Sequence, residues 1–289
     1  MPELPEVETM RLQLEKFLVG HKVTDIKILD TRILSGDVKK LIGGKVVGTR
    51  RFGKVSVIDL SNGYSILTHV KLTGQYIYRG PNLENPEKLS GKVTGGVPGP
   101  HTLVIFNLDK KGVLYYNDVR RFGWIKIVDS SQVTVDGFIG KLGPEPPVVK
   151  DFTGKKLTPE IFKDILSKTK RSIKVVLMDQ SKMGGVGNIY ANDALWLSKI
   201  NPKTPSNQLS NQLTNQLFEA ILTVLKAGLK YGGASELAFV TPDGLEGEYQ
   251  NHTLVYGHEG MPCERCHKSM IEKYFLGGRG TYWCPVCQK

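Results

Sequence analysis

Gly143-Pro144-Glu145-Pro146-Pro147 divides the 289-residue sequence into two halves whose residue patterns differ. Residues 23–128 form short runs rich in β-branched and aromatic residues, punctuated by glycine, which is typical of antiparallel strands. Beyond the proline cluster, apolar residues recur at helical spacing, and Thr158 with Pro159 is a helix-starting pair. The sequence therefore predicts an α+β fold of two domains, in which an antiparallel β-sandwich is followed by a helical domain.

A helix is expected before the first strand. Apolar side chains recur there at a spacing of three or four residues: Val7, Met10, Leu14 and Phe17. Acidic residues cluster at the positive N-terminal end of this segment, and Gly20 supplies a C-terminal stop. The sandwich is thus predicted to carry one amphipathic helix at the start of the chain.

The charge balance points to a polyanionic partner. The chain has 39 Lys and Arg residues against 28 Asp and Glu residues, a net charge of +11. Cations that meet phosphates release condensed counterions, so this surplus favours nucleic acid binding. With 40% hydrophobic and 23% charged residues, the chain is neither disordered nor collagen-like. An acidic N-terminus without an apolar run predicts a cytoplasmic location and no membrane association.

All four cysteines lie in the C-terminal tail, as Cys263-x2-Cys266, then 17 residues, then Cys284-x2-Cys287. Two CxxC pairs at this separation are typical of four thiolates around one structural zinc ion. With no ligand position open to water, such an ion stabilises the tail and does not catalyse. The alternative is covalent haem attachment at Cys263–His267, which requires export and leaves the second CxxC unused.

Two loops carry patterns suited to DNA. Gly184-Gly185-Val186-Gly187 precedes a helix that begins near Asn188, and exposed N–H groups at such a start bind phosphate. A plain turn between helices explains the glycines equally well. In Asn117-Asp118-Val119-Arg120-Arg121-Phe122-Gly123, arginines stand beside an aromatic that can wedge between base pairs. The alternative for this run is a salt-bridged strand end.

The N-terminus is a candidate nucleophile. If Met1 is removed, Pro2 becomes a free secondary amine, and an α-amino group is roughly a tenth neutral at pH 7. Attack of this amine on a sugar C1′ gives a cationic iminium that makes the C2′ proton removable. Glu3 is close enough in sequence to move protons for such a centre. The alternative is an ordinary helix start with acidic neighbours.

Together these motifs resemble the formamidopyrimidine-DNA glycosylase (Fpg, or MutM) family. The resemblance is carried, in the family's order, by MPELPEVET (residues 1–9), Gly53-Lys54, DVRRFG (118–123), GVGNIYA (185–191) and residues 255–289. It implies an N-terminal helix and β-sandwich, then a helical domain with a helix–two-turn–helix element and a zinc finger. The predicted divisions are a catalytic domain over 1–140, a linker over 141–157, a helix–two-turn–helix domain over 158–250 and a zinc finger over 251–289.

The resemblance implies a base-excision DNA repair enzyme, a bifunctional glycosylase and AP lyase that acts on 8-oxoguanine and formamidopyrimidines in duplex DNA. Such an enzyme extrudes the damaged nucleotide, because the glycosidic carbon cannot be reached inside the stack. By resemblance, Pro2 is the Schiff-base nucleophile and Glu3 the proton donor that helps open the sugar. Lys54 matches the lysine assigned to β-elimination, and Arg279 the arginine assigned to δ-elimination.

The resemblance also implies DNA contacts by His101, Lys170, Lys174 and Asn188. Arg120, Phe122 and Leu72 match the three void-filling residues, although the family usually has methionine where this chain has Leu72. Residues 231–250 fall where the family caps the extruded base. A monomer associated with the nucleoid, working on damaged double-stranded DNA without a nucleotide cofactor, is expected from the same resemblance.

Two alternatives share the motifs. Endonuclease VIII has the same chemistry but prefers oxidised pyrimidines, and its opening usually reads PEGPE. Leu4 in place of that glycine favours the purine enzyme. The other alternative is a non-catalytic protein that binds lesion-containing DNA, against which Pro2, Glu3, Lys54 and Arg279 are all present.

Overall fold

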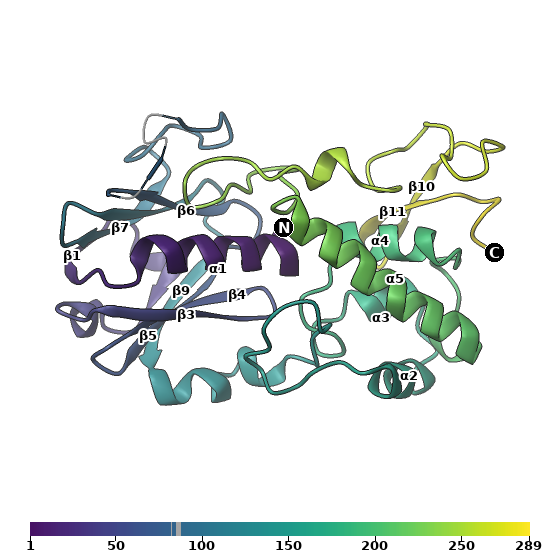
Figure 1. Ribbon diagram of the computed structural model, residues 1–289, viewed down its shortest axis with the longest axis horizontal. Helices are drawn as coiled ribbons and strands as arrows, with labels where there is room; N and C mark the ends of the chain where they lie inside the picture. The colour runs from purple at the N-terminus through teal and green to yellow at the C-terminus, as the bar shows by residue number, and fades with distance from the viewer. Residues whose placement is uncertain (82, 85–87) are drawn as a thin grey trace. The chain divides into compact units, whose positions relative to one another are not determined.

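The computed structural model describes residues 1–81, 83–84 and 88–289. It separates into two compact units (Figure 1). The first comprises Met1–Gly140 together with Leu229–Gln250, and the second comprises Lys141–Gly228 together with Asn251–Lys289. The sequence places residues 158–250 in one helical domain, whereas here Leu229–Gln250 packs with the first unit. The finer four-part division stays a prediction.

The first unit is the predicted helix and β-sandwich. One sheet has the strand order β1-β7-β8-β6 and the other β2-β9-β5-β4-β3, and the paired strands are antiparallel except for the short β2–β9 pair. The helices are α1 (Leu4–Leu18), η1 (Thr31–Ile33), η2 (Val38–Leu41), η3 (Ser130–Val135) and η4 (Ile139–Lys141). The strands are β1 (Val23–Ile28), β2 (Leu34–Ser35), β3 (Val46–Phe52), β4 (Val55–Leu60), β5 (Tyr64–His69), β6 (Gly74–Arg79), β7 (Thr102–Leu108), β8 (Val113–Asp118) and β9 (Trp124–Asp129).

The core of this unit lies between the two sheets and α1. The apolar stripe predicted from the helical spacing is buried, with Val7, Met10, Leu14 and Phe17 each at most 4% exposed. Side chains of both sheets join the same cluster, and Phe17 stacks on Tyr78 of β6 with ring centroids 5.0 Å apart. Burial of this stripe places the start of α1, and hence the N-terminus, against the sandwich.

The second unit is helical and ends in a two-stranded hairpin. Its helices are α2 (Pro159–Ser167), α3 (Ile173–Leu177), α4 (Asn188–Leu197) and η5 (Ser206–Gln208), with α5 (Asn211–Lys230) beginning in it and η6 (Tyr249–Asn251) at its later boundary. The hairpin strands are β10 (Glu272–Leu276) and β11 (Arg279–Trp283). A Cβ on Gly228 would lie 2.4 Å from the Tyr190 hydroxyl, so glycine lets α5 approach α4 closely.

Among the described residues, none of the helices is both long and apolar enough to cross a bilayer.

Candidate active site, DNA-contacting residues and metal site

The first turn of α1 fixes the residues at the N-terminus. Pro2 and Glu3 are buried, and Glu3 is the N-cap of the helix. Glu3 and Glu6 form a reciprocal capping box, in which the Glu3 backbone N–H donates to the Glu6 carboxylate at 2.7 Å. A carboxylate in this position satisfies N–H groups at the helix start. Local sequence therefore fixes the Glu3 side chain at the start of α1, one residue after the proposed nucleophile.

Lys54 lies in the tight turn between β3 and β4 and is only 4% exposed. A buried ion pair ties this turn to α1, since Arg51 Nε contacts Glu8 Oε2 at 3.0 Å and Arg51 also donates to the Gly53 carbonyl at 2.9 Å. Removing one partner of such a pair leaves an uncompensated buried charge, which costs about 3–5 kcal/mol. The pair holds the Lys54 turn in a fixed place relative to the first turns of α1.

His69, at the end of β5, is a site residue that sequence reasoning did not single out. Its ring is 3% exposed and packs against Trp124 and Phe138 at 5.9 and 5.6 Å between centroids. Burial, followed by the positive charges of Lys71, Lys54 and the N-terminal amine, lowers the pKa of His69 to about 3. The N-terminus, Lys54 and a neutral imidazole thus share one electrostatic neighbourhood.

This lowered pKa predicts a pH dependence of stability. The folded pKa of about 3 lies below the ordinary value of 6.5, so the unfolded chain binds a proton first as the pH falls. The free energy of unfolding should fall between pH 6.5 and pH 3, with His69 contributing up to about 1.4 kcal/mol per pH unit. In the parent protein the Lys71 N–H donates to His69 Nδ1 at 3.0 Å. His69→Asn keeps an acceptor for this N–H but has no group that binds a proton in this pH range.

Chemical denaturation at a series of pH values checks this. His69→Asn should show a shallower loss of stability between pH 6 and pH 4 than the parent protein. The exposed His252→Asn serves as the control and should retain the parental slope. Parallel slopes for His69→Asn and the parent would contradict the prediction.

The three predicted void-filling residues come from two adjacent turns. Leu72 lies between β5 and β6, and the Arg120 guanidinium lies over the Phe122 ring at 4.7 Å from its centroid. Fully buried Asp118 joins the turns, because it accepts hydrogen bonds from the Thr73 hydroxyl and, at 2.8 Å, from the Gly123 N–H.

This junction leaves the Phe122 side chain 60% exposed. A Cβ on Gly123 would lie 1.9 Å from the Tyr116 hydroxyl, so the bend after Phe122 requires glycine. His101 is the neighbour of this loop, as its carbonyl accepts the Asp118 N–H at 2.9 Å. The predicted contacts His101, Arg120 and Phe122 therefore lie together.

In the second unit, α4 carries the predicted residue Asn188 and forms hydrogen bonds with the C-terminal segment. Asn188 begins this helix, and four residues later the fully buried Asn192 accepts from the Tyr282 N–H at 2.9 Å. Asp193 accepts from the Val255 and Tyr256 N–H groups at 3.0 and 3.1 Å. Sequence reasoning did not single out Asn192 or Asp193. Both come immediately after the GVGNIYA motif in the chain, and that position is the signal that could have found them.

Lys170 and Lys174 occupy different environments. Lys170 is exposed just before α3, whereas Lys174 is fully buried and its ammonium donates to the Gly280 carbonyl and the Thr281 hydroxyl, both at 2.7 Å. The Lys174 side chain therefore supports the hairpin.

Arg279 begins β11 and is exposed, after a turn in which Gly277 and Gly278 both have positive φ. The hairpin thus presents Arg279 at the start of a strand that is held by Lys174 of α3 and Asn192 of α4.

The four cysteines converge beside this hairpin. Their sulfur atoms lie within 4.8 Å of one another, with Cys263 Sγ 3.8 Å from Cys287 Sγ and Cys266 Sγ 3.7 Å from Cys284 Sγ. Tetrahedral Zn–S bonds of about 2.3 Å place sulfur atoms roughly 3.8 Å apart. The spacing fits a four-coordinate metal ion held by thiolates, as the sequence pattern predicts.

Comparison with known proteins gives consistent matches over the chain. Residues 1–125 match the formamidopyrimidine-DNA glycosylase N-terminal domain, and residues 142–239 match the formamidopyrimidine-DNA glycosylase H2TH domain. The formamidopyrimidine-DNA glycosylase of Lactiplantibacillus plantarum is 35% identical over 295 residues, covering 100% of both chains.

Solved structures give the same result. Wild-type Lactococcus lactis Fpg (MutM) in complex with DNA containing N7-benzyl-Fapy-dG superposes with a TM-score of 0.84 at 33% identity, covering 100% of both chains. A complex of the same wild-type protein with DNA containing an oxidised pyrimidine has a TM-score of 0.83 at 34% identity, again over 100% of both chains.

Proposed function

This chain belongs to the formamidopyrimidine-DNA glycosylase family, and from that membership we propose that it is a bifunctional glycosylase and AP lyase that removes oxidised purines from duplex DNA. The observation that carries the proposal is the buried N-terminal turn, where Pro2 and Glu3 are held by the Glu3–Glu6 capping box beside the Lys54 turn. A repair enzyme that uses an N-terminal amine needs this combination of a fixed amine, a carboxyl group and a second cation.

The proposed chemistry follows from these groups. After Met1 is removed, the Pro2 nitrogen attacks C1′ of the damaged nucleotide, the bond from C1′ to the base breaks, and Glu3 supplies the proton that helps open the sugar. The resulting iminium acidifies the C2′ proton, whose removal breaks the C3′–O bond. We assign Lys54 to this β-elimination and Arg279 to the later δ-elimination, which cuts the strand on the other side of the sugar.

The proposed DNA contacts fall into two groups. Leu72, Arg120 and Phe122 are proposed to fill the space left by the extruded nucleotide, since exposed apolar and guanidinium groups suit an opened base stack. His101, Lys170, Lys174 and Asn188 are proposed to bind the backbone. The Lys174 ammonium is buried under the hairpin and already donates to Gly280 and Thr281. We therefore propose that Lys174 acts on DNA binding indirectly, by holding those two residues in position. A location on the nucleoid would follow from these contacts.

We propose that the four cysteines hold one structural zinc ion, which would cross-link the tail and leave no position for a reacting water. Purified protein should contain about one zinc per chain, measured by elemental mass spectrometry. Cys284→Ser should lose the metal and loosen the β10–β11 hairpin, because structural zinc sites contribute folding energy directly. Protease digestion should then cut this variant within residues 263–289. A metal-free tail that resists protease as well as the parent would contradict the assignment.

A lesion panel tests the proposed activity. The protein should cleave a duplex with 8-oxoguanine opposite cytosine and leave phosphates at both ends of the gap, the product of successive β- and δ-elimination. Cleavage only of a duplex with an oxidised pyrimidine would favour the endonuclease VIII alternative, a comparison worth making because a similar solved structure holds such DNA. Binding of either duplex without cleavage would indicate a non-catalytic protein.

A further inference from the structure

Residues 231–250 of the first unit form a loop whose two ends are closed on each other. The Tyr249 N–H donates to the Gly233 carbonyl at 3.0 Å, and the Glu248 N–H donates to the Tyr231 carbonyl at 2.8 Å. Gly233 has a φ of +86°, and its missing side chain lets the backbone approach Glu6, because a Cβ would lie 2.8 Å from that residue. The loop between these ends runs along β6, where the Tyr78 N–H donates to the Pro242 carbonyl at 2.7 Å (Figure 1).

The loop begins beside the catalytic N-terminus. The Glu6 carboxylate accepts the Ala234 N–H through one oxygen and the Glu3 N–H through the other, each at 2.7 Å. One carboxylate therefore bridges Ala234, near the start of the loop, to the residue after Pro2. Shortly beyond this anchor, Leu237 is 59% exposed although its neighbour Phe239 is buried. The loop thus exposes an apolar side chain three residues beyond its anchor to Glu6.

Lys92, in the connection between β6 and β7, clamps the two sides of this loop together. Its ammonium donates to the Ser235 carbonyl on the outgoing side and contacts Glu246 Oε2 at 2.6 Å on the returning side. The Ser90 hydroxyl donates to the other Glu246 oxygen at 2.5 Å. Hydrogen bonds from Lys92 and then Ser90 lower the pKa of Glu246, so the carboxylate stays ionised and the clamp persists near neutral pH.

A second contact aligns the clamp with the middle of the loop. The Gln75 amide of β6 donates to the Ala238 carbonyl at 2.6 Å and to the Lys92 carbonyl at 2.9 Å. One side chain of the sandwich therefore sets the position of both Lys92 and the residue after Leu237. Because both bonds are made by the same amide group, a shift of the Lys92 segment is transmitted to the loop.

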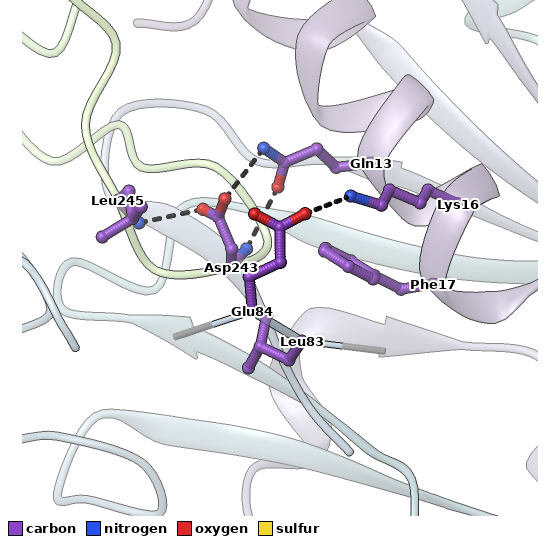
Figure 2. Close-up of a pocket in the computed structure, with 7 residues that line it drawn as sticks. All are labelled: Gln13, Lys16, Phe17, Leu83, Glu84, Asp243 and Leu245. Carbon is purple, nitrogen blue, oxygen red and sulfur yellow. Dashed lines mark hydrogen bonds and ion pairs between the residues drawn. The ribbon is translucent and has the colours of Figure 1, made fainter. Parts of the chain in front are cut away.

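The far turn of the loop is fixed to α1 instead. Figure 2 shows Gln13 and Asp243 exchanging two hydrogen bonds, each 3.1 Å, with the Leu245 N–H donating to Asp243 at 3.0 Å. Lys16 contacts Glu84 at 3.3 Å across the same cavity. The polar side chains that line this cavity are thus paired with one another. The Gln13–Asp243 pair among them anchors the Asp243 turn to α1.

We propose that Lys92 is a positioning residue for the damaged base, because it bridges Ser235 and Glu246 and so holds the loop with Leu237 against the base that is extruded beside Pro2. This inference rests on the proposed glycosylase function. A base that departs from C1′ after attack by Pro2 must lie within a few ångströms of that nitrogen, where the loop begins. An abasic sugar has no base, so its cleavage does not require the loop.

This difference between substrates provides the test. Single-turnover cleavage is measured on a duplex with 8-oxoguanine and on one with a preformed abasic site. Lys92→Met should slow the first about tenfold, as expected for a misplaced reacting group, and the second by less than about twofold. Glu246→Gln should act in the same direction, and Lys92→Arg should retain most of the parental rate. Lys88→Met is the matched control, a loss of the same charge from an exposed residue of the same connection.

The outcomes distinguish failure of the proposed glycosylase function from failure of the positioning role of Lys92. If the parent protein cleaves neither duplex, the proposed function fails. If the parent cleaves both and Lys92→Met equals Lys88→Met on 8-oxoguanine, only the positioning inference is overturned. Equal losses on the two duplexes would also overturn it, because they would indicate a general structural role. Thermal unfolding of each variant reports whether it folds. If Lys92→Met does not fold, the comparison is made with Glu246→Gln instead.

Discussion

Glu3→Gln is expected to slow excision of 8-oxoguanine about a thousandfold, within the range that a lost general acid produces. Glutamine has no acidic proton to give to the sugar, but its carbonyl oxygen can still accept the N–H that the Glu3 side chain caps. The start of α1 should therefore keep its geometry while the chemistry is lost. Cleavage at a preformed abasic site should fall by no more than about tenfold, because that sugar already opens to an aldehyde in water.

Glu15→Gln is the matched control for this variant. It makes the same chemical change in the same helix, at a half-exposed residue that contacts Arg11 at 2.5 Å. Its rates on both substrates should equal those of the parent protein. Single-turnover kinetics with separated products provide the measurement. If Glu3→Gln excised 8-oxoguanine at the parental rate, another group would have to be the proton donor.

Borohydride reduction is expected to join the protein covalently to an 8-oxoguanine duplex through Pro2. The reductant converts an iminium to a stable amine, so the adduct records the intermediate itself. Pro2→Gly should reduce the rate of adduct formation at least about a hundredfold. Proline's secondary amine gives an iminium that is permanently cationic, whereas the imine of glycine must bind a proton to become so. Peptide mass spectrometry locates the adduct and shows whether Met1 is absent.

Pro5→Gly is the control for loosening of the chain at the helix start. It makes the same substitution within the first turn of α1, where no free amine is involved. Adduct formation by this variant should stay close to the parental rate if it folds, which thermal unfolding measures. An adduct on Lys54 in the parent protein, or retention of Met1 in a fully active protein, would contradict the assignment of Pro2.

Much of the fold follows from local sequence patterns. The apolar spacing of Val7, Met10, Leu14 and Phe17 predicts a buried helix face, and that face is buried. The β-branched runs before Pro144 predict an antiparallel sandwich, and two sheets form there. The two CxxC pairs predict that four sulfur atoms converge, and they do. These features could be predicted because periodicity and ligand spacing act over a few residues and leave a repeated mark in the sequence.

Other parts of the site depend on residues that are distant in the chain, and no local pattern marks them. Lys174 looks like a surface cation in sequence but is fully buried, because the backbone of the hairpin around Gly280 lies against it. The neutral state of His69 results from burial together with the charges of Lys71, Lys54 and the N-terminus, which no local pattern around His69 predicts.

By itself, then, the sequence determined the two kinds of architecture, the convergence of the four cysteines and the residues at the start of α1. The tertiary structure alone decided that one Glu6 carboxylate joins Glu3 to Ala234, and that Lys92 meets Glu246. The physical reason is that a hydrogen bond or ion pair depends on where two atoms lie in space. Residues separated by more than a hundred positions reach that distance only after the core has packed.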